Sequence, residues 1–166
     1  MGSDAIWIVG SNMTKFGKHP DKDVIDLASE ASRKALKDAE ISLADVGVLG
    51  VGNLMNAGAG IGQQLQKQIG QTGIPVFNVS NACATGATAL RVAVMAVKAG
   101  ETDVGMAVGV EKLAGAGLLG QTGQKPKSET WEPNGRYGAL SSTEGRIGTG
   151  IMPGVFAQIG MEYGHK

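Results

Sequence analysis

The segment Asn78-Val79-Ser80-Asn81-Ala82-Cys83-Ala84-Thr85-Gly86-Ala87-Thr88-Ala89-Leu90 joins an apolar run to a stretch of small residues. Residues 74–79 are predicted to form a buried strand, and residues 84–99 a helix that ends at Gly100. A strand that leads directly into a helix is the repeating unit of α/β folds. The only cysteine of the chain, Cys83, falls at the turn between the two elements.

The same alternation extends in both directions from this segment. Apolar runs at residues 5–9, 45–51 and 104–110 predict further strands, and helical spacing predicts helices at 24–40 and 59–69. Residues 104–110 are almost continuously apolar, which is typical of a strand buried on both faces. We therefore expect an α/β fold with a mostly parallel sheet and helices on both of its faces.

The pattern changes after this core. Residues 114–150 are rich in Gly, Ser, Thr, Pro and charged side chains and show no period, which predicts a long loop. Helical spacing returns at residues 153–163, where Pro153 suits the first turn of a helix. We expect residues 1–113 to form the α/β core and residues 114–166 to form part of a loop subdomain.

Composition argues against several classes of function. The 15 basic residues balance the 15 acidic ones, so the chain has no net positive charge that would favour binding of nucleic acid. A single cysteine excludes an internal disulfide and a multi-cysteine zinc site, and we expect no metal. The N-terminus lacks a signal-like apolar stretch, and Arg91 and Lys98 interrupt the longest apolar segment. We expect no membrane span and a cytoplasmic location.

The position of Cys83 suits nucleophilic chemistry. Backbone N–H groups and the dipole at the start of a helix stabilise a thiolate, and they also stabilise an oxyanion on an attacked thioester. The neighbouring small residues would let an acyl chain approach closely. The alternative, on position alone, is that Cys83 is a small apolar residue buried beside an Ala-rich helix.

A resemblance to a known family favours the first interpretation. The segment 78–90, and its Cys-Ala-Thr-Gly core above all, resembles the nucleophile segment of thiolases of the sterol-carrier-protein-2 type. Residues 108–113 resemble the family strand that ends in Gly-x-Glu-Lys, and residues 10–17 and 152–164 are similar to two further segments of the subgroup. Together these pieces span essentially the whole chain in the family order.

The resemblance implies a thiolase-like fold and an acyl-CoA acyltransferase of the 3-oxoacyl-CoA thiolase or acetyl-CoA C-acyltransferase type. In this interpretation Cys83 carries the acyl group, coenzyme A is a cosubstrate, and no cofactor is tightly bound. The pathway would belong to lipid or sterol side-chain metabolism. Family members dimerise beside the strand that precedes the nucleophile, so a homodimer through residues 74–79 is expected.

The resemblance also implies that a C-terminal thiolase half is absent from this chain. That half supplies the family's activating histidine, whereas His19 and His165 fall in no family histidine motif. Two alternatives follow. The chain could belong to a retro-aldolase that acts on steroid-derived CoA thioesters together with a small partner protein, or it could be a non-catalytic half that needs a complementary chain.

Other residues carry weaker signals. Glu111 could orient a partner group near a catalytic floor, but a structural ion pair with Lys112 is expected instead. The Gly115–Gly120 match to a dinucleotide-binding pattern is interpreted as a loop. In the long loop, three cations could meet the phosphates of coenzyme A or simply be solvated, and two aromatic residues could line an acyl channel or anchor the loop. These residues are Lys125, Lys127 and Arg136, and Trp131 and Tyr137.

Overall fold

The computed structural model describes residues 5–112, 156, 159–161 and 163–165. The chain divides into two compact units, Met1–Lys112 and Leu113–Lys166. In the second unit, residues 156, 159–161, 163 and 164 are helical. These residues fall on the helix predicted at 153–163 or directly after it, whereas the predicted loop at 114–150 lies outside the described residues.

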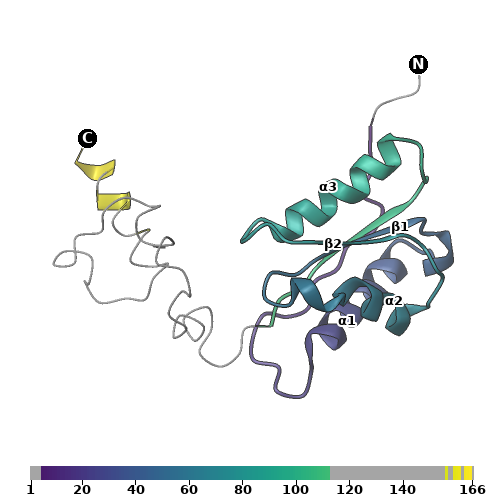
Figure 1. Cartoon of the computed structure of the whole chain (residues 1–166), viewed down its shortest axis with the longest axis horizontal. Coiled ribbons are helices and arrows are strands. Elements are labelled where there is room, and N and C mark those ends of the chain that lie inside the picture. The colour runs from purple at the N-terminus through teal and green to yellow at the C-terminus, as the bar shows by residue number, and fades with distance from the viewer. Residues whose placement is uncertain (1–4, 113–155, 157–158, 162, 166) are drawn as a thin grey trace. The chain divides into compact units, whose positions relative to one another are not determined.

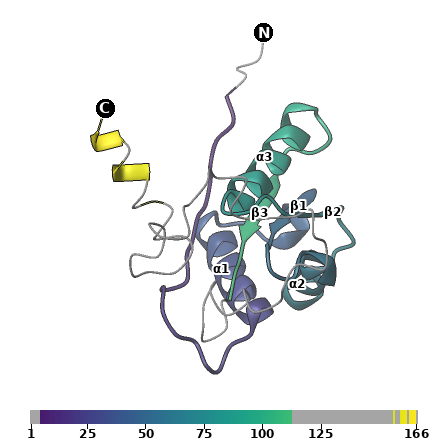
Figure 2. The same ribbon diagram turned by 60° about the vertical axis from the view of Figure 1, so that its left-hand side comes forward.

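The first unit is a three-stranded parallel sheet with helices on both faces. Strands β1 (Val48–Gly52), β2 (Val76–Val79) and β3 (Gly105–Gly109) lie in the order β2-β1-β3. Helix α3 (Thr85–Lys98) covers one face, and α1 (Val24–Asp38) and α2 (Ile61–Ile69) cover the other (Figure 1; Figure 2). The predicted α/β fold is confirmed.

The sheet face toward α1 and α2 carries the large side chains of the core. Leu49 from β1 and Leu65 from α2 are completely buried, and Met106 and Val108 of β3 join the same cluster. Alternate strand residues point to the same face, so one stripe of each strand supplies the apolar surface that the two helices cover. Removing this surface from water drives the assembly of the layer.

The opposite face is lined by glycine, and this allows α3 to approach the strands very closely. A Cβ atom added at Gly50 would lie 2.7 Å from the carbonyl oxygen of Ala89, and one at Gly52 would lie 2.7 Å from that of Thr85. A Cβ atom added at Gly109 would lie 3.1 Å from the Cα atom of Gly86. The first turn of α3 is therefore seated directly on the carboxyl ends of β1 and β3.

The strand predicted at residues 5–9 is wrong. Residues 5–15 form no strand, and Trp7 and Ile8 are 80% and 75% exposed. Only the apolar character of these residues predicted the strand. A strand also needs a neighbouring strand to pair with, and residues 6–10 make no backbone hydrogen bond within residues 5–112. The prediction at 45–51 was displaced, because Leu43–Asp45 is a 3-10 turn and β1 begins at Val48.

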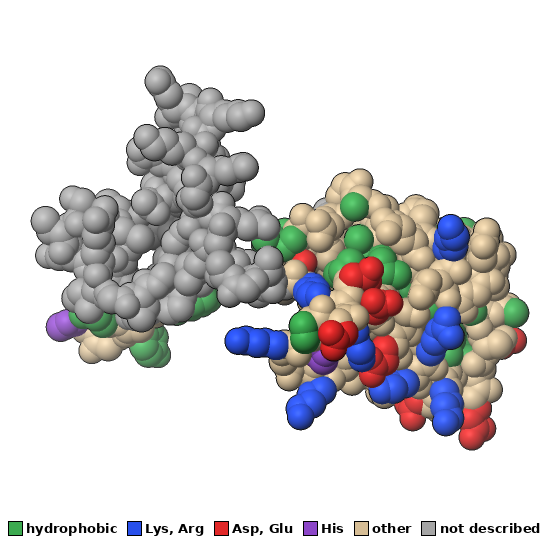
Figure 3. Space-filling model, turned by 90° about the horizontal axis from the view of Figure 1, so that it is seen from below, with side chains coloured by type: hydrophobic (Ala, Val, Ile, Leu, Met, Phe, Trp, Pro, Cys, Tyr) green, Lys and Arg blue, Asp and Glu red, His purple; other side chains and the backbone are tan. Residues whose placement is uncertain are grey.

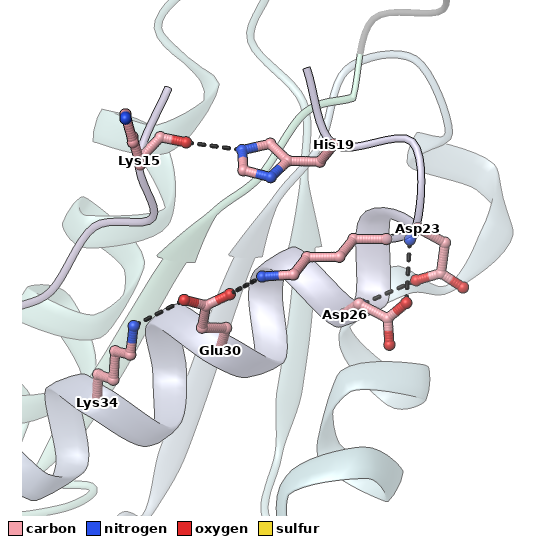
Figure 4. A network of polar contacts seen from close by, with 7 residues as sticks. Lys15, His19, Asp23, Asp26, Glu30 and Lys34 are labelled. Carbon is pink, nitrogen blue, oxygen red and sulfur yellow. Dashed lines mark hydrogen bonds and ion pairs between the residues drawn. The ribbon is translucent and has the colours of Figure 1, made fainter. Parts of the chain in front are cut away.

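The first turn of α1 is fixed by local polar contacts (Figure 4). Asp23 and Asp26 form a reciprocal capping box, each carboxylate accepting the backbone N–H of the other residue. One turn further on, Glu30 pairs with both Lys22 and Lys34. The hydrogen bonds from Lys22 and then Lys34 lower the pKa of Glu30 from 4.5 to about 2.

Within the described residues, no helix combines the length and the apolar character needed to cross a bilayer.

We expect Gly50→Ala to lower the free energy of unfolding by about 1–3 kcal/mol, because the added methyl group meets the backbone of α3 and forces it away from the sheet. Gly58→Ala is the matched control, since a Cβ atom there meets nothing within 4 Å. Urea unfolding followed by circular dichroism measures both. Equal losses in the two variants would contradict the close seating of α3.

Glu30 should make stability depend on acid pH. Its folded pKa lies below its unfolded value, so its contribution is fully present above pH 4.5 and is lost as the pH falls toward about 2. The stability difference between the wild type and Glu30→Gln should therefore shrink over this interval. Urea unfolding at a series of pH values tests it, with Glu101→Gln as the control because Glu101 forms no ion pair among the described residues.

Candidate active site

Cys83 lies in the short connection between β2 and α3, two residues before the helix begins. Its side chain is exposed and its thiol is free. The prediction of a strand-to-helix turn is therefore confirmed, and the alternative of a buried apolar cysteine is wrong for this unit. An exposed thiol at this place can be reached by a substrate from solvent.

Thr85 holds the turn that presents Cys83. Its buried hydroxyl accepts the backbone N–H of Asn81 at 2.7 Å and donates to the carbonyl oxygen of Ala82 at 2.6 Å. The side-chain amide of Asn81 also donates to the hydroxyl of Thr88 at 3.0 Å. These bonds tie both ends of the turn to the first turn of α3, so the position of the thiol is set by the helix.

The residue before the cysteine is in an unfavourable conformation. Ala82 has φ 44°, in the left-handed region that residues with a Cβ atom seldom adopt. The hydrogen bond from Thr85 to the Ala82 carbonyl oxygen holds it there. Strain of this kind is kept only where the surrounding contacts enforce it.

The start of α3 offers backbone donors beside the thiol. Ala84 and Thr85 donate their N–H groups to the carbonyl oxygens of Asn81 and Ala82. Within residues 5–112 no hydrogen bond is formed by the backbone N–H groups of Cys83, Gly86 or Ala87. Such groups at a helix start, together with the helix dipole, favour an anion, here a thiolate or the oxyanion of an attacked thioester.

The carboxyl ends of all three strands are joined by Asn53, which directly follows β1. Its backbone N–H donates to Val79 at the end of β2, and its buried side-chain amide donates to the carbonyl oxygen of Val110 at 2.8 Å. Glu111 accepts from this amide and from the backbone N–H groups of Leu54 and Met55. The loop after β1 is thus attached to the end of β3.

Sequence reasoning missed Asn53, and it predicted the wrong partner for Glu111. Glu111 does not pair with Lys112, whose ammonium group instead donates to the carbonyl oxygen of Lys22. The usable signal for Asn53 was its position, because a polar residue directly after a buried parallel strand lies at the edge where sites form. The choice of partner depends on how the strand ends are arranged in space, which local pattern does not reveal.

Asn78 links β2 to α2. Its side-chain oxygen accepts the backbone N–H of Gly62 at 2.7 Å, and its amide donates to the side chain of Gln63 at 2.7 Å. It therefore satisfies a donor in the first turn of α2, which has no side-chain cap of its own. Asn78 therefore attaches β2 to α2 on one face of the sheet. On the other face, the Asn81–Ala84 turn attaches β2 to α3.

The remaining predicted residues are not part of this arrangement. His19 donates from Nε2 to the carbonyl oxygen of Lys15 at 2.7 Å in the loop before α1 (Figure 4), and His165 is exposed in the second unit. No group of three or more His, Cys, Asp or Glu side chains able to hold a metal occurs in the part of the chain that the structure describes. Lys125, Lys127, Arg136, Trp131, Tyr137 and the Gly115–Gly120 pattern lie outside the described residues.

Charged side chains of both signs are interspersed on the face drawn in Figure 3. This arrangement gives that face no extended potential of one sign.

The first unit is thus a parallel α/β layer that carries one exposed, free cysteine directly before a helix. The family of the thiolase N-terminal domain matches residues 6–132. This chain belongs to the thiolase family, and an acetyl-CoA acetyltransferase is among its relatives.

Two curated relatives and one solved structure are similar to this chain. Human sterol carrier protein 2 is 33% identical over 97% of this chain and 29% of its own length. Acetyl-CoA acetyltransferase of Methanothermobacter thermautotrophicus is 40% identical over 64% of this chain and 29% of its own length. The crystal structure of the priming β-ketosynthase of the R1128 polyketide pathway covers 51% of this chain and 26% of that chain, at 26% identity and a TM-score of 0.45. The chain thus spans under a third of the length of the two curated relatives.

The hydroxyl of Thr85 should be required to hold the nucleophile turn. Thr85→Val keeps the shape but leaves the Asn81 N–H unpaired, while the Ala82 carbonyl keeps only its bond from the backbone N–H of residue 85. We expect it to lower the free energy of unfolding by about 1–3 kcal/mol and to change the alkylation rate of Cys83. Thr85→Ser keeps both bonds and should remain close to wild type in both. Urea unfolding and timed reaction with iodoacetamide provide the measurements. A Ser variant as impaired as the Val variant would refute the role of the hydroxyl.

Proposed function

We propose that this chain is the nucleophile-bearing part of a thiolase-type acyl-CoA acyltransferase, with Cys83 as the residue that accepts the acyl group. The observation that carries the proposal is the exposed Cys83 thiol beside backbone N–H groups that have no hydrogen-bond partner in the first unit. Because the chain belongs to the thiolase family, acyl transfer is the reaction proposed for this thiol.

The proposed reaction uses the thiolate of Cys83 as a nucleophile toward the C3 carbonyl carbon of a 3-oxoacyl-CoA. A carbon–sulfur bond forms, and the bond between C2 and C3 breaks. The departing carbanion takes up a proton and leaves as acetyl-CoA, or as propionyl-CoA when C2 bears a methyl group. The thiol of free coenzyme A then accepts the acyl group from Cys83, which restores the thiol.

Backbone N–H groups at the start of α3 are the groups of this chain suited to the oxyanion formed in each attack. Donors fixed in advance at the site of developing charge typically contribute 10²–10³-fold to rate in acyl transfer. The rigid tie between the turn and α3, through Thr85 and Asn81, supports such a role because it keeps sulfur and donors in one relative position.

Activation of the thiol is proposed to need groups outside the first unit. His19 is engaged with the carbonyl oxygen of Lys15 in the loop before α1, and no other histidine occurs in residues 5–112. The curated relatives contain more than twice the length of this chain, which supports a complementary part that supplies the base. The proposed assembly also includes a homodimer through β2, an edge strand whose Phe77 is 46% exposed.

Coenzyme A is the proposed cosubstrate, and a lipid or sterol-derived acyl chain is the proposed cargo. Support for the lipid class is the kinship with sterol carrier protein 2, whose name refers to such a ligand. The phosphate groups of coenzyme A would need cationic partners, and the candidates, chosen on charge alone, are Lys125, Lys127 and Arg136.

The first test is the intact mass of the chain before and after incubation with acetoacetyl-CoA. Because the activating base is proposed to lie outside the first unit, we expect the wild type to gain one acetyl group only slowly. We expect none on Cys83→Ala or Cys83→Ser, since only a thiolate both attacks and leaves readily. Treatment with iodoacetamide is the control for an accessible thiol.

Three outcomes separate the hypotheses. An adduct that survives in Cys83→Ala would place the nucleophile elsewhere. Quantitative alkylation without any acetyl adduct would refute acylation by the chain alone and would favour a half that needs its complement. Cleavage of a 3-hydroxyacyl-CoA in the Cys83→Ala variant would indicate retro-aldol chemistry instead.

A further inference from the structure

Glu111 is exposed, yet its carboxylate accepts three hydrogen bonds from one loop. Oε2 accepts the backbone N–H groups of Leu54 and Met55 at 2.9 and 3.3 Å, and Oε1 accepts the side-chain amide of Asn53 at 3.3 Å. Hydrogen bonds to an ionised acceptor are stronger than those between neutral groups. Glu111 forms no ion pair within residues 5–112, so the loop after β1 provides its partners there.

The loop that Glu111 holds is built around the side chain of Asn53. The side-chain oxygen of Asn53 accepts the backbone N–H of Asn56 at 2.6 Å, while its amide donates to the carbonyl oxygen of Val110 at 2.8 Å. Asn53 is 3% exposed, so these partners take the place of water for its polar groups. Asn53, Val110 and Glu111 together form a strand-end clamp that joins the end of β1 to the end of β3.

The strand-end clamp lies one residue beyond the two glycines on which α3 rests. A Cβ atom at Gly52 would lie 2.7 Å from the carbonyl oxygen of Thr85, and one at Gly109 would lie 3.1 Å from the Cα atom of Gly86. The residue after Gly109 donates its backbone N–H to the carbonyl oxygen of Gly52 at 3.0 Å. The clamp therefore joins the two strand ends that support the first turn of α3.

Two connections lead from the strand-end clamp to Cys83. Thr85, which lies against the end of β1, holds the Cys83 turn through its hydroxyl. The backbone N–H of Asn53 also donates to the carbonyl oxygen of Val79 at 3.3 Å, at the point where β2 leads into that turn. A separation of the strand ends would therefore displace the sulfur and the backbone N–H groups of the helix start relative to one another.

We propose that Glu111 is a positioning residue for acyl transfer at Cys83. Its carboxylate keeps the ends of β1 and β3 together beneath the first turn of α3, and this keeps the backbone N–H groups of that turn beside the sulfur. No hydrogen bond joins Glu111 to Cys83 within residues 5–112, so Glu111 acts through Asn53 and Thr85. The proposal rests on the proposed function, in which Cys83 is the nucleophile.

The test compares Glu111→Ala with Glu111→Gln in the 166-residue chain, by the rate at which iodoacetamide alkylates Cys83. Glu111→Ala removes all three bonds, so the thiolate loses donors and the rate at pH 7 should fall at least threefold. At about pH 10, where an exposed thiol is ionised in any case, the rate should change less than twofold. Glu111→Gln keeps an oxygen acceptor for Leu54 and Met55 and should stay within twofold of the wild type at both pH values.

Amide hydrogen exchange at Leu54 and Met55 reports the strand-end clamp itself. Exchange there should be at least tenfold faster in Glu111→Ala and close to wild type in Glu111→Gln, because only the first variant removes the acceptor. Glu101→Ala is the matched control, since it removes an exposed carboxylate that forms no ion pair among the described residues, and it should change neither readout. Urea unfolding verifies that all three variants fold.

The proposal is overturned if exchange at Leu54 and Met55 accelerates in Glu111→Ala while the alkylation of Cys83 keeps its wild-type pH dependence. The clamp would then hold the loop alone. An equal loss of alkylation rate in Glu111→Gln or in Glu101→Ala would assign the effect to charge and would also overturn it. Alkylation needs no acyl donor, so a wild type that takes no acetyl group from acetoacetyl-CoA would count against the proposed function and leave this readout intact.

Discussion

The contact between α3 and the glycine-lined face of β1 and β3 is the constraint on which the rest of the first unit depends. The α3 backbone lies so close to Gly50 and Gly52 that no side chain fits between helix and sheet. This contact fixes the distance between the helix axis and the strands. The opposite face carries Leu49, Val51 and their neighbours, which require thicker layers. Since side chains alternate along a strand, a slip of one residue would present bulky groups to α3 and cavities to α1 and α2. The close contact therefore also fixes the register of the sheet.

This seating determines where Cys83, the proposed nucleophile, lies. Because α3 starts over the strand ends, the connection from β2 must turn sharply, and Cys83 falls on that turn. Thr85 and Asn81 hold the turn with short polar contacts, while Asn53 attaches the ends of β1, β2 and β3 to one another. The site thus stands on the rigid part of the fold, and the groups that hold it come from segments up to 58 residues apart along the chain.

The sequence was sufficient for the layers and for the position of Cys83, because both depend on local pattern: apolar runs, helical spacing and a turn between them. The predictions from sequence were wrong where the outcome depends on which residues lie side by side in space. Residues 6–9 have the apolar character of a strand, but no strand of residues 5–112 pairs with them, and Glu111 bonds to backbone groups that no pattern brings near it. The hydroxyl of Thr85 was also beyond reach, since Thr in the first turn of a helix has several possible partners and only the geometry selects among them.

The left-handed conformation of Ala82 restricts which residues can precede the nucleophile. Glycine would adopt it freely, alanine adopts it at a cost, and β-branched or bulky residues are strongly disfavoured. The backbone therefore requires a small residue at this position. Variation among small residues at position 82 would report on how tightly the turn is strained, and it should not be mistaken for a record of substrate choice.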